Sequence, residues 1–494
     1  MHIEPGEQPP AIIRLWSLRE EVTVETGPAA DHLNVISRWG EIELADATAA
    51  ERDLLNRLSL GPMAIANVAE GDQAALGRVL DRVRGLLVHS LGTEDVVGEL
   101  LSAVPVSPQA TFTPPDVGRT DLVRLSRFAA MRTASDALVL ESPLARYRVV
   151  LHRPLAAWVV GALGSPITVA DLADTMHADF ALITAVVSYL VAASMVAIGE
   201  RDERSDAAWF AEDRDPGLTP WSHHDLLFHS RSRMGRQDDP LGAVYRYVGT
   251  FPPLPAVKPV PEGRRFPLHK PMLEEASAGD PSLTGAIERR DSVREFAEQP
   301  LSAEQVGELL YRTARIRSLM EVTAPGGVPY MISDRPYPSS DSLYELELYV
   351  TVDRCAGLPR GIYHYDPLDH ALTLTSTDET DLAKLLDDAA VLIRTLRRPA
   401  ALITMTARIA RLSWVYDGIA YSTALKHVGV LQQTLYLVAT AMGLGPCALA
   451  IGDSDVATRA FGLDWPAEVS IGEFAIGLRL DRTPAPAIYQ VDES

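Results

Sequence analysis

The chain of 494 residues is too long for one ordinary domain, and its content of 47% hydrophobic and 22% charged residues is typical of a globular protein. A formal net charge of −21 disfavours nucleic acid and anionic membranes as partners, because both are bound through an excess of Lys and Arg. With no signal segment, no apolar run long enough to cross a bilayer and only two cysteines, the sequence predicts a cytoplasmic protein without a disulfide framework.

A pattern of two strands, three helices and a short strand occurs twice near the N-terminus. It predicts one winged-helix-like unit over residues 1–115 and another over residues 116–205. The first unit has expected strands at 32–37 and 41–45 and helices near 48, 63–68 and 73–87. The second has strands at 137–142 and 146–152, helices at 155–163, 168–176 and 180–195, and a wing strand at 196–199. Thr168 and Asp171 have the spacing of a helix-capping box.

The usual role of a winged-helix unit is DNA binding, but the third helix of the second copy, FALITAVVSYLVAASM, carries no Lys or Arg. A recognition helix needs such groups to meet phosphates and base edges, so we reject DNA binding for this copy. Two alternatives remain for the N-terminal region. One is a docking module that accepts a strand from a peptide or protein at an open sheet edge, and the other is a structural spacer.

Residues 206–268 are expected to form a helical and proline-rich linker. It contains His223, His224, Asp225 and His229, but their spacing matches no closed metal site, so we expect a bracing helix and no metal.

A C-terminal domain is expected over residues 269–494. Strands are predicted at 344–352, 361–366, 371–376 and 400–410 and within 447–453 and 469–480; helices are predicted at 281–290, from Ser302 with a Ser302–Gln305 capping box, at 381–396 and at 414–442. The segment 324–342 is rich in Gly and Pro and is expected to be a loop.

The stretch RRDSVREF (289–296) places three guanidiniums and a serine hydroxyl close together in an acidic chain. Arg matches phosphate oxygens two at a time, and a serine hydroxyl and backbone N–H groups can fill the remaining acceptor sites. The stretch is therefore a candidate cradle for a phosphate monoester; the alternative is a solvated basic turn.

Five motifs occur in the order of the SagB-type dehydrogenases: RRDSVREF, RPYPSSDSLYELELY (335–349), GIYHYDPLDHAL (361–372), RLSWVYDGIAY (411–421) and GLGPCAL (443–449). Over residues 120–494 the chain resembles this family of FMN enzymes in the nitroreductase-like superfamily, which oxidise thiazoline and oxazoline rings of ribosomal peptides. The resemblance implies an α+β C-terminal domain with a mixed, mostly antiparallel sheet wrapped by helices. It also implies a homodimer, with the 414–442 helix at the interface.

The resemblance assigns roles to individual residues. The FMN phosphate is expected at Arg290, Ser292 and Arg294, with Arg289 beside them and Asp291 contributing its backbone. The flavin ring is expected along a loop that commonly comes from the partner subunit: Pro338, Ser339, Ser340, Asp341 and Ser342. Ser340 and Asp341 stand where the family usually has two glycines. On the long helix Gly429 and Gln433 match the family, while Val430 and Thr434 replace His and Asn. The flavin N5 edge is expected at the segment Ala448–Ile451, which includes Leu449 and Ala450.

The sharpest departure is Val415, which precedes Tyr416 where azoline-oxidising members have Lys-Tyr. A positioned base contributes roughly 10²–10⁴-fold to proton removal, and valine cannot supply one. Tyr416 is the candidate catalytic residue, able to orient a substrate or relay a proton, but its ordinary pKa near 10 makes it a poor base unaided. Lys426 lies about 16 Å further along the helix and is no direct substitute.

Three functions are weighed for the chain. The first is FMN-dependent oxidation of azolines to azoles in a modified precursor peptide, with the N-terminal units holding a leader peptide or a cyclodehydratase partner. The second is FMN-dependent redox modification of another peptide- or carrier-bound residue, which the missing lysine motivates. The third is a non-catalytic assembly protein, against which the intact arginine cradle argues.

Overall fold

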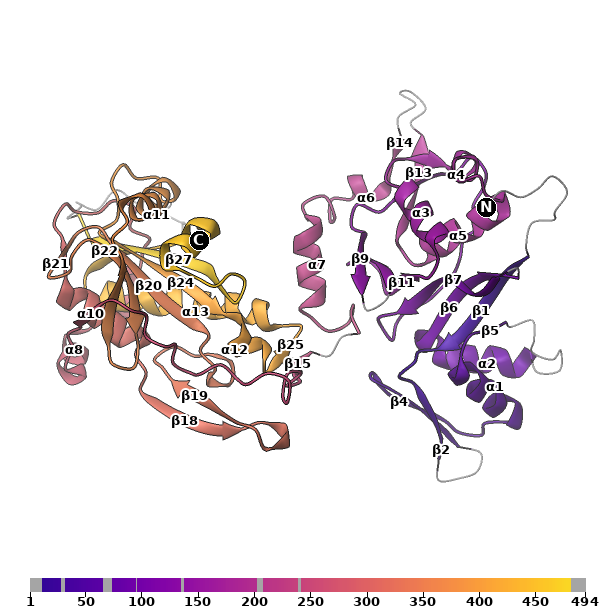
Figure 1. The fold of residues 1–494 in the computed structure, drawn as a ribbon, viewed down its shortest axis with the longest axis horizontal. Helices are drawn as coiled ribbons and strands as arrows, with labels where there is room; N and C mark the ends of the chain where they lie inside the picture. The colour runs from indigo at the N-terminus through magenta and orange to yellow at the C-terminus, as the bar shows by residue number, and fades with distance from the viewer. Residues whose placement is uncertain are drawn as a thin grey trace, which may run out of the picture. The chain divides into compact units, whose positions relative to one another are not determined.

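The structure is a computed structural model that describes residues 11–27, 32–64, 73–94, 96–134, 137–201, 208–238 and 241–480. Its contacts divide the chain into two compact units, Met1–Asp239 and Pro240–Ser494, each described here by itself (Figure 1). Residues 206–268, expected to be a linker, are thus divided between the two units.

The larger sheet of the first unit takes strands from both predicted winged-helix-like units. It is antiparallel, in the order β5–β1–β6–β7–β11–β10–β9. The strands are β5 (Met63–Ala64), β1 (Ile12–Leu18), β6 (Leu87–Thr93), β7 (Val96–Pro105), β11 (Tyr147–Leu151), β10 (Ala137–Glu141) and β9 (Ala130–Ala134). Because β7 pairs with β11, segments expected in separate units share one sheet.

The helix expected over 73–87 is shorter than predicted. α2 (Gln73–Val83) ends in a 3-10 turn at Arg84–Leu86, and Leu87 begins β6. All seven residues of β6 are buried, so the strand lacks the apolar–polar alternation that would have marked it in the sequence. Of the helix expected at 63–68, Met63 and Ala64 form β5 instead, and the remaining residues lie outside the described ranges.

A second, three-stranded sheet of the first unit has the order β2–β3–β4, with β2 (Thr23–Thr26), β3 (Leu33–Ser37) and β4 (Gly40–Leu44). Its buried Leu33 and Val35 pack in one core with Leu55 of α1 (Ala49–Leu60) and Val83 of α2. A reciprocal capping box between Thr48 and Glu51 begins α1. In this sheet β4 is an edge strand.

The remainder of the first unit contains a third sheet in the order β12–β8–β13–β14 and five helices among its described residues. The strands are β12 (Ile167–Thr168), β8 (Leu122–Leu125), β13 (Val196–Arg201) and β14 (Ala208–Trp209); the helices are α3 (Pro154–Ala162), α4 (Val169–Met176), α5 (Phe180–Ala192), α6 (Ala211–Arg214) and α7 (His223–Arg231). The Thr168 side chain caps α4 by accepting from the Asp171 N–H, as the spacing predicts. Seven residues of α5 are buried, which accounts for its apolar sequence. The winged-helix interpretation stays a prediction.

The second unit is built on an antiparallel seven-stranded sheet in the order β16–β23–β22–β20–β24–β27–β26. The strands are β16 (Arg264–Pro267), β23 (Ala371–Ser376), β22 (Gly361–Asp366), β20 (Leu346–Val352), β24 (Ala401–Arg408), β27 (Glu468–Leu478) and β26 (Leu444–Leu449). The predicted hairpin of β22 and β23 is confirmed.

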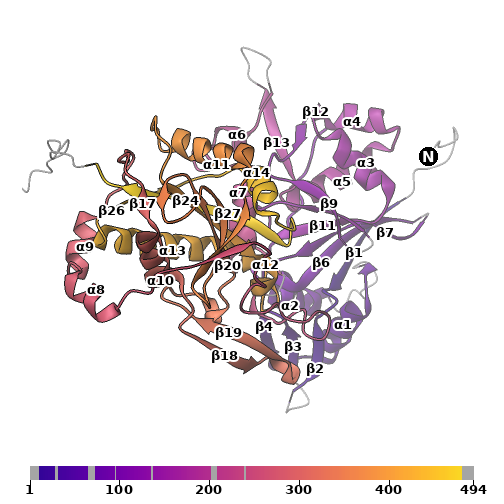
Figure 2. The same cartoon turned by 60° about the vertical axis from the view of Figure 1, so that its left-hand side comes forward.

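Helices cover both faces of this sheet. On one face lie α10 (Ala303–Ala314) and α13 (Ala420–Ala441), and on the other lie α11 (Glu379–Leu392) and α14 (Ser454–Phe461) (Figure 2). The predicted alternation of β20 fits this arrangement, because Leu348 and Val350 pack toward α10 and α13 while Tyr349 packs toward α11 and α14. The predicted Ser302–Gln305 capping box begins α10.

Two expectations for the second unit are wrong. The segment 324–342 is not all loop: β18 (Ser318–Thr323) and β19 (Pro329–Asp334) pair as a hairpin, with a 3-10 turn at Pro325–Gly327 between them. The segment expected to be largely one long helix over 414–442 is helical only from Ala420 to Ala441, in α13, so the prediction begins the helix six residues too early. α12 (Ile409–Ser413) ends before it, and β25 (Tyr416–Asp417) pairs with β15 (Gly242–Ala243) from a distant part of the sequence. The backbone N–H of Tyr245 bonds the Val415 carbonyl, and Gly418 at φ +70° redirects the chain before α13 begins.

The other short elements of the second unit are α8 (Leu273–Gly279), α9 (Leu283–Arg289), a parallel pair of β17 (Leu301–Ser302) with β21 (Cys355–Ala356), and a 3-10 turn at Ser340–Ser342.

Candidate functional site

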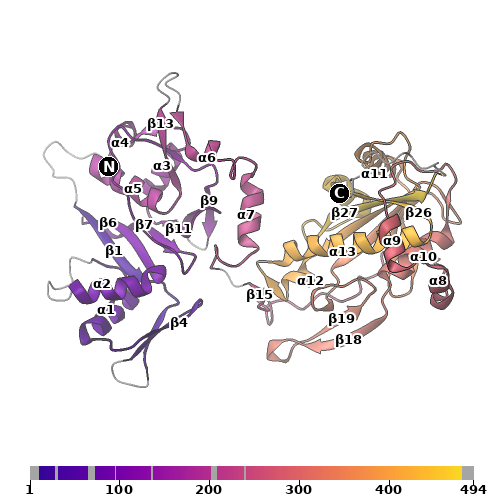
Figure 3. The same cartoon turned by 180° about the vertical axis from the view of Figure 1, so that it is seen from behind.

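The arginine-rich stretch follows α9, which lies beside α13 (Figure 3). It is fixed to the sheet where the Val293 N–H donates to the Pro446 carbonyl at 2.8 Å. Arg290 lies over the ring of Tyr436, with 5.3 Å between its guanidinium carbon and the ring centroid. Among the described residues, neither Arg290 nor Arg294 forms an ion pair with a carboxylate, although the chain is strongly acidic. Both guanidiniums are thus available for an anion.

Tyr436 of α13 connects this stretch to β26. Its hydroxyl accepts from the Ala448 N–H at 2.8 Å and lies 2.8 Å from Oγ of Ser292. Because the tyrosine has one hydroxyl proton, it can donate that proton to Ser292 and leave the serine O–H free for an external acceptor. Ser292, Arg290 and Arg294 therefore offer a donor set that fits a phosphate group.

Asp291 and Arg289 have other contacts. Asp291 forms an ion pair with Arg479, whose Nε also donates to the Leu444 carbonyl at 3.1 Å. Arg289 donates to the Gly285 carbonyl within α9 and is otherwise exposed. The sequence interpretation missed both Tyr436 and Arg479, because neither belongs to a motif that it had singled out.

The loop of residues 338–342 has a left-handed backbone at Asp341, one of the two positions where the family usually has glycine, and also at the next residue, Ser342. Asp341 and Ser342 have φ values of +47° and +55°, in the left-handed region that non-glycine residues seldom adopt. The loop is held by the buried His427 of α13, whose Nε2 accepts from the Ser340 N–H at 2.9 Å. The other ring nitrogen therefore carries the proton and donates to the buried Glu345 carboxylate at 2.8 Å.

Tyr416 is tied to the same loop, since its hydroxyl donates to Oδ2 of Asp341 at 2.6 Å. Burial, together with the neighbouring Asp341 carboxylate, raises the pKa of Tyr416 well above its ordinary value, so the phenol stays protonated at neutral pH. The Val415 side chain is fully buried in the core.

The remaining predicted residues vary in exposure. Pro338 and Gln433 are exposed, Ser339 accepts from the Tyr344 N–H, Leu449 is buried, and Ala450 and Ile451 are exposed at the end of β26. Along α13, His427 and Tyr436 are nine positions apart, so their side chains leave the helix about 180° apart at roughly 100° per residue. The arginine cradle and the 338–342 loop thus meet α13 on different sides.

Two family models match the chain. The model described as the cyanobactin oxidase ThcOx matches residues 123–238, and the nitroreductase family model matches residues 287–478, a range that includes Arg290, the loop and Tyr416. An oxidase-type match followed by a nitroreductase match supports a SagB-type, nitroreductase-like protein. Its second unit has a nitroreductase-like α+β fold, and the protein is an oxidoreductase by family.

Several known proteins are similar to this chain. A protein of Methanocaldococcus jannaschii named as a nitroreductase is 26% identical over 195 residues, which are 39% of this chain and 89% of the relative. A solved nitroreductase-named structure from Ralstonia eutropha is 21% identical and covers 49% of this chain and 100% of its own, with a TM-score of 0.36. A chain of the microcin synthetase McbBCD complex of E. coli, solved with truncated pro-MccB17 bound, is 24% identical, with coverage of 39% and 70% and a TM-score of 0.33.

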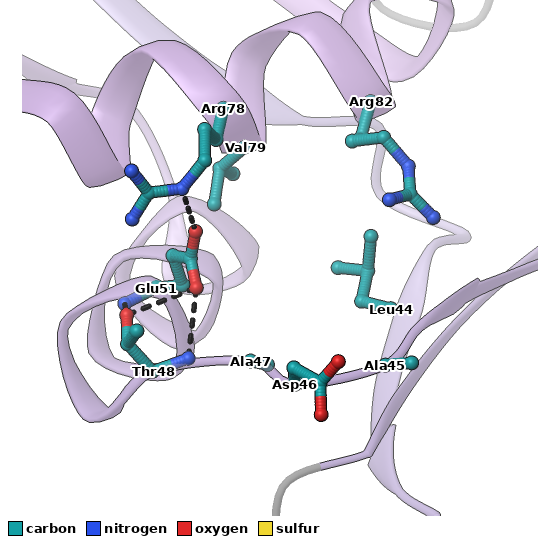
Figure 4. Close-up of a pocket in the computed structure, with 9 residues that line it drawn as sticks. All are labelled: Leu44, Ala45, Asp46, Ala47, Thr48, Glu51, Arg78, Val79 and Arg82. Atoms are coloured by element: carbon teal, nitrogen blue, oxygen red, sulfur yellow. Dashed lines mark hydrogen bonds and ion pairs between the residues drawn. The ribbon is translucent and has the colours of Figure 1, made fainter.

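The first unit has a cavity of about 350 Å³ beside the end of β4 (Figure 4). It lies between the β4–α1 connection, residues 44–48, and the face of α2 that bears Arg78, Val79 and Arg82. Arg78 is paired with Glu51, and Arg82 donates to the Glu43 carbonyl of β4 at 2.6 Å. This arrangement places an open strand edge next to a cavity.

The described residues contain no candidate metal site and no helix that could span a membrane. No group of three or more His, Cys, Asp or Glu side chains there converges on a possible metal position, and the segment around His223 forms α7. None of the helices in the described ranges combines the length and the apolar character needed to span a bilayer.

Proposed function

We propose that this protein is an FMN-dependent oxidase of ribosomal-peptide biosynthesis that converts azoline rings of a modified precursor peptide to azoles. The observation that carries the proposal is the donor set of Arg290, Arg294 and Ser292, whose guanidiniums have no carboxylate partner among the described residues and whose hydroxyl is oriented by Tyr436. These residues would hold the FMN phosphate, with Arg289 and the backbone of Asp291 beside it. FMN, when bound, supplies the hydride acceptor.

Residues of this chain are proposed to accept the proton that leaves the azoline ring. Formation of an azole removes a proton from a ring carbon in addition to a hydride. Tyr416 presents its phenol oxygen, and Asp341 accepts the phenol proton at 2.6 Å. We propose that the substrate proton passes to Tyr416 as the phenol proton passes to Asp341. Asp341 would then take over the role of the family lysine that Val415 replaces.

We also propose a homodimer, on the basis of where the loop contacts α13. Since the cradle and the loop contact different sides of α13, the loop of residues 338–342 is proposed to serve the flavin held by the cradle of the partner subunit. Coexpression of an Arg290→Ala, Arg294→Ala chain with an Asp341→Asn chain tests this arrangement. A mixed dimer would then contain one intact site, and about a quarter of wild-type activity is expected from random pairing. A site built within one subunit would give no recovery.

The first unit is proposed to hold the precursor peptide. The edge of β4, where Arg82 already occupies the Glu43 carbonyl, supplies backbone donors and acceptors for an added strand, and the adjacent 350 Å³ cavity can receive the side chains of that strand. A cyclodehydratase that installs the azolines is the expected companion in this reaction sequence.

The decisive assay incubates flavin-loaded protein with an azoline-containing peptide and measures a mass loss of two hydrogens. Loss of the flavin absorption bands in the Arg290→Ala, Arg294→Ala variant, with retention in Arg397→Ala, would support the cradle. The second candidate, oxidation or reduction of another peptide- or carrier-bound residue, is favoured by the buried Val415 and would be indicated by bound FMN without azoline oxidation. A protein that never binds flavin would indicate the non-catalytic assembly role.

A further inference from the structure

A groove on the α11 side of the second unit ends at two buried polar side chains. Its inner part is a cavity of about 20 Å³ between α11, β24, β27 and the segment that follows β26. Its outer part is an open depression of about 490 Å³ with exposed Val391, Leu392 and Ile451 on its walls. The two parts share Leu392, Ile451 and Gly452, so they form one groove with a narrow end.

Glu473 and Thr404 line the narrow end. They are directly opposed across β27 and β24, and their exposed fractions are 7% and 1%. The Thr404 hydroxyl has no hydrogen-bond partner, and no described residue donates to the Glu473 carboxylate. Buried polar groups are almost always paired, so two such groups at the end of a groove indicate a ligand that supplies donors.

Gly452 keeps this carboxylate at the groove. A Cβ placed on Gly452 would lie 2.1 Å from Oε1 of Glu473, a distance at which the carboxylate would have to move. A glycine at this position therefore allows the backbone that follows β26 to pass directly over Glu473.

Two of the three other carboxylates at the groove, those of Asp388 and Asp453, already have hydrogen-bond partners. Asp388 of α11 is paired with Lys384, Asp453 caps α14, and Asp455 lies at the outer rim. Glu473 thus faces three carboxylates and one lysine that is already engaged, and its burial raises its pKa to about 7. A cation entering the narrow end would gain the Glu473 charge without displacing an existing pair.

The volume of the narrow end of the groove limits the size of the cationic group that can enter it. A volume of about 20 Å³ holds one group the size of a water molecule, which fits an ammonium and excludes a planar guanidinium. The apolar walls suit an aliphatic stem. We propose that this groove binds a lysine side chain of the peptide substrate, with its ammonium between Glu473 and Thr404 and its stem along Leu392 and Ile451. The proposal rests on the proposed peptide substrate.

The test is a ligand-observed NMR titration of the full-length protein with n-butylammonium, and 1-butanol serves as the neutral isostere. Saturable binding of the amine and none of the alcohol is expected. Glu473→Gln should weaken amine binding at least tenfold, Thr404→Val should weaken it several-fold, and Glu304→Gln, which removes a carboxylate on α10, should leave it unchanged. Binding should strengthen as pH rises from 6 to 8, because Glu473 ionises in that range while the amine stays charged.

Two short peptides, acetyl-Gly-Lys-Gly-amide and its norleucine counterpart, identify the source of the ammonium. Preference for the lysine peptide that disappears in Glu473→Gln supports the proposal. Equal binding of both peptides while n-butylammonium still binds would overturn it in favour of a site for free amines. The proposal would also be overturned if Glu473→Gln left the affinity for the amine unchanged, or if the protein bound no amine at all. None of these readouts needs azoline oxidation, so failure of the proposed function is seen separately.

Discussion

Replacement of Glu473 by Gln is expected to change the pH dependence of stability by an amount that the structure sets. Burial raises the pKa of this carboxyl from 4.5 to about 7 in the folded protein, and a difference of about 2.5 in pKa corresponds to about 3 kcal/mol. Between these two pH values the unfolded chain has released the proton while the folded protein retains it. Stability of the wild-type second unit is therefore lost as pH rises from 4.5 to about 7.

Glutamine does not titrate, so Glu473→Gln should become more stable relative to wild type by about 3 kcal/mol between pH 4 and pH 8. Urea unfolding at constant ionic strength, followed through the transition of the second unit, measures the difference at each pH. Glu304→Gln, at an exposed position in the first turn of α10, should give a difference that does not change with pH. A flat difference for Glu473→Gln would refute the reasoning, since it would mean that the folded protein ionises this carboxyl at the ordinary pKa.

Three further substitutions test the candidate site. Tyr436→Phe leaves the Ala448 N–H without its acceptor and Ser292 without its orienting donor. Flavin affinity, measured by flavin fluorescence, should therefore fall. The free energy of unfolding, measured by urea titration, should drop by about 1–3 kcal/mol. His427→Ala leaves the buried Glu345 carboxylate without its partner and should cost about 3 kcal/mol or more, whereas the exposed His224→Ala should be neutral in the same denaturation assay. Asp341→Asn keeps a residue that tolerates the left-handed backbone but removes the carboxylate that accepts from Tyr416. Azoline oxidation should fall about 100-fold while the flavin content stays unchanged. Ultraviolet titration should show a lower pKa for Tyr416.

Local sequence signals predicted the elements that local chemistry determines. The capping residues Ser302 and Thr168 marked real helix starts, and the alternation in 344–352 marked β20. Strands that form by pairing with residues far away in the sequence were not predicted. β6 and β7 lie between neighbouring strands of their sheet, and β25 exists because β15, more than 170 residues earlier, pairs with it. The helix predicted over 414–442 included Val415, but the carbonyl of that residue accepts a hydrogen bond from the Tyr245 N–H.

The same distinction applies to the site. The arginine cradle is contiguous in sequence, so its motif could be found without a structure. Tyr436, which orients Ser292, lies 144 positions after it in the sequence, so its role could be recognised only from the folded structure. The contact of Asp341 with Tyr416 spans 75 positions in the sequence. It involves two departures from the family pattern: Asp341 stands where glycine is usual, and Tyr416 follows Val415, which stands where lysine is usual.

These two departures are easiest to understand as one change. Loss of the lysine removes a proton acceptor beside Tyr416, and replacement of a glycine places a carboxylate 2.6 Å from the same phenol. The second change has a cost, because Asp341 must hold a φ of +47° that glycine would adopt freely. His427 and Glu345 offset that cost by fixing Ser340, the residue before it, to α13. A loop that only lined a cofactor would have no need of this arrangement, so the strained carboxylate favours a role in proton transfer.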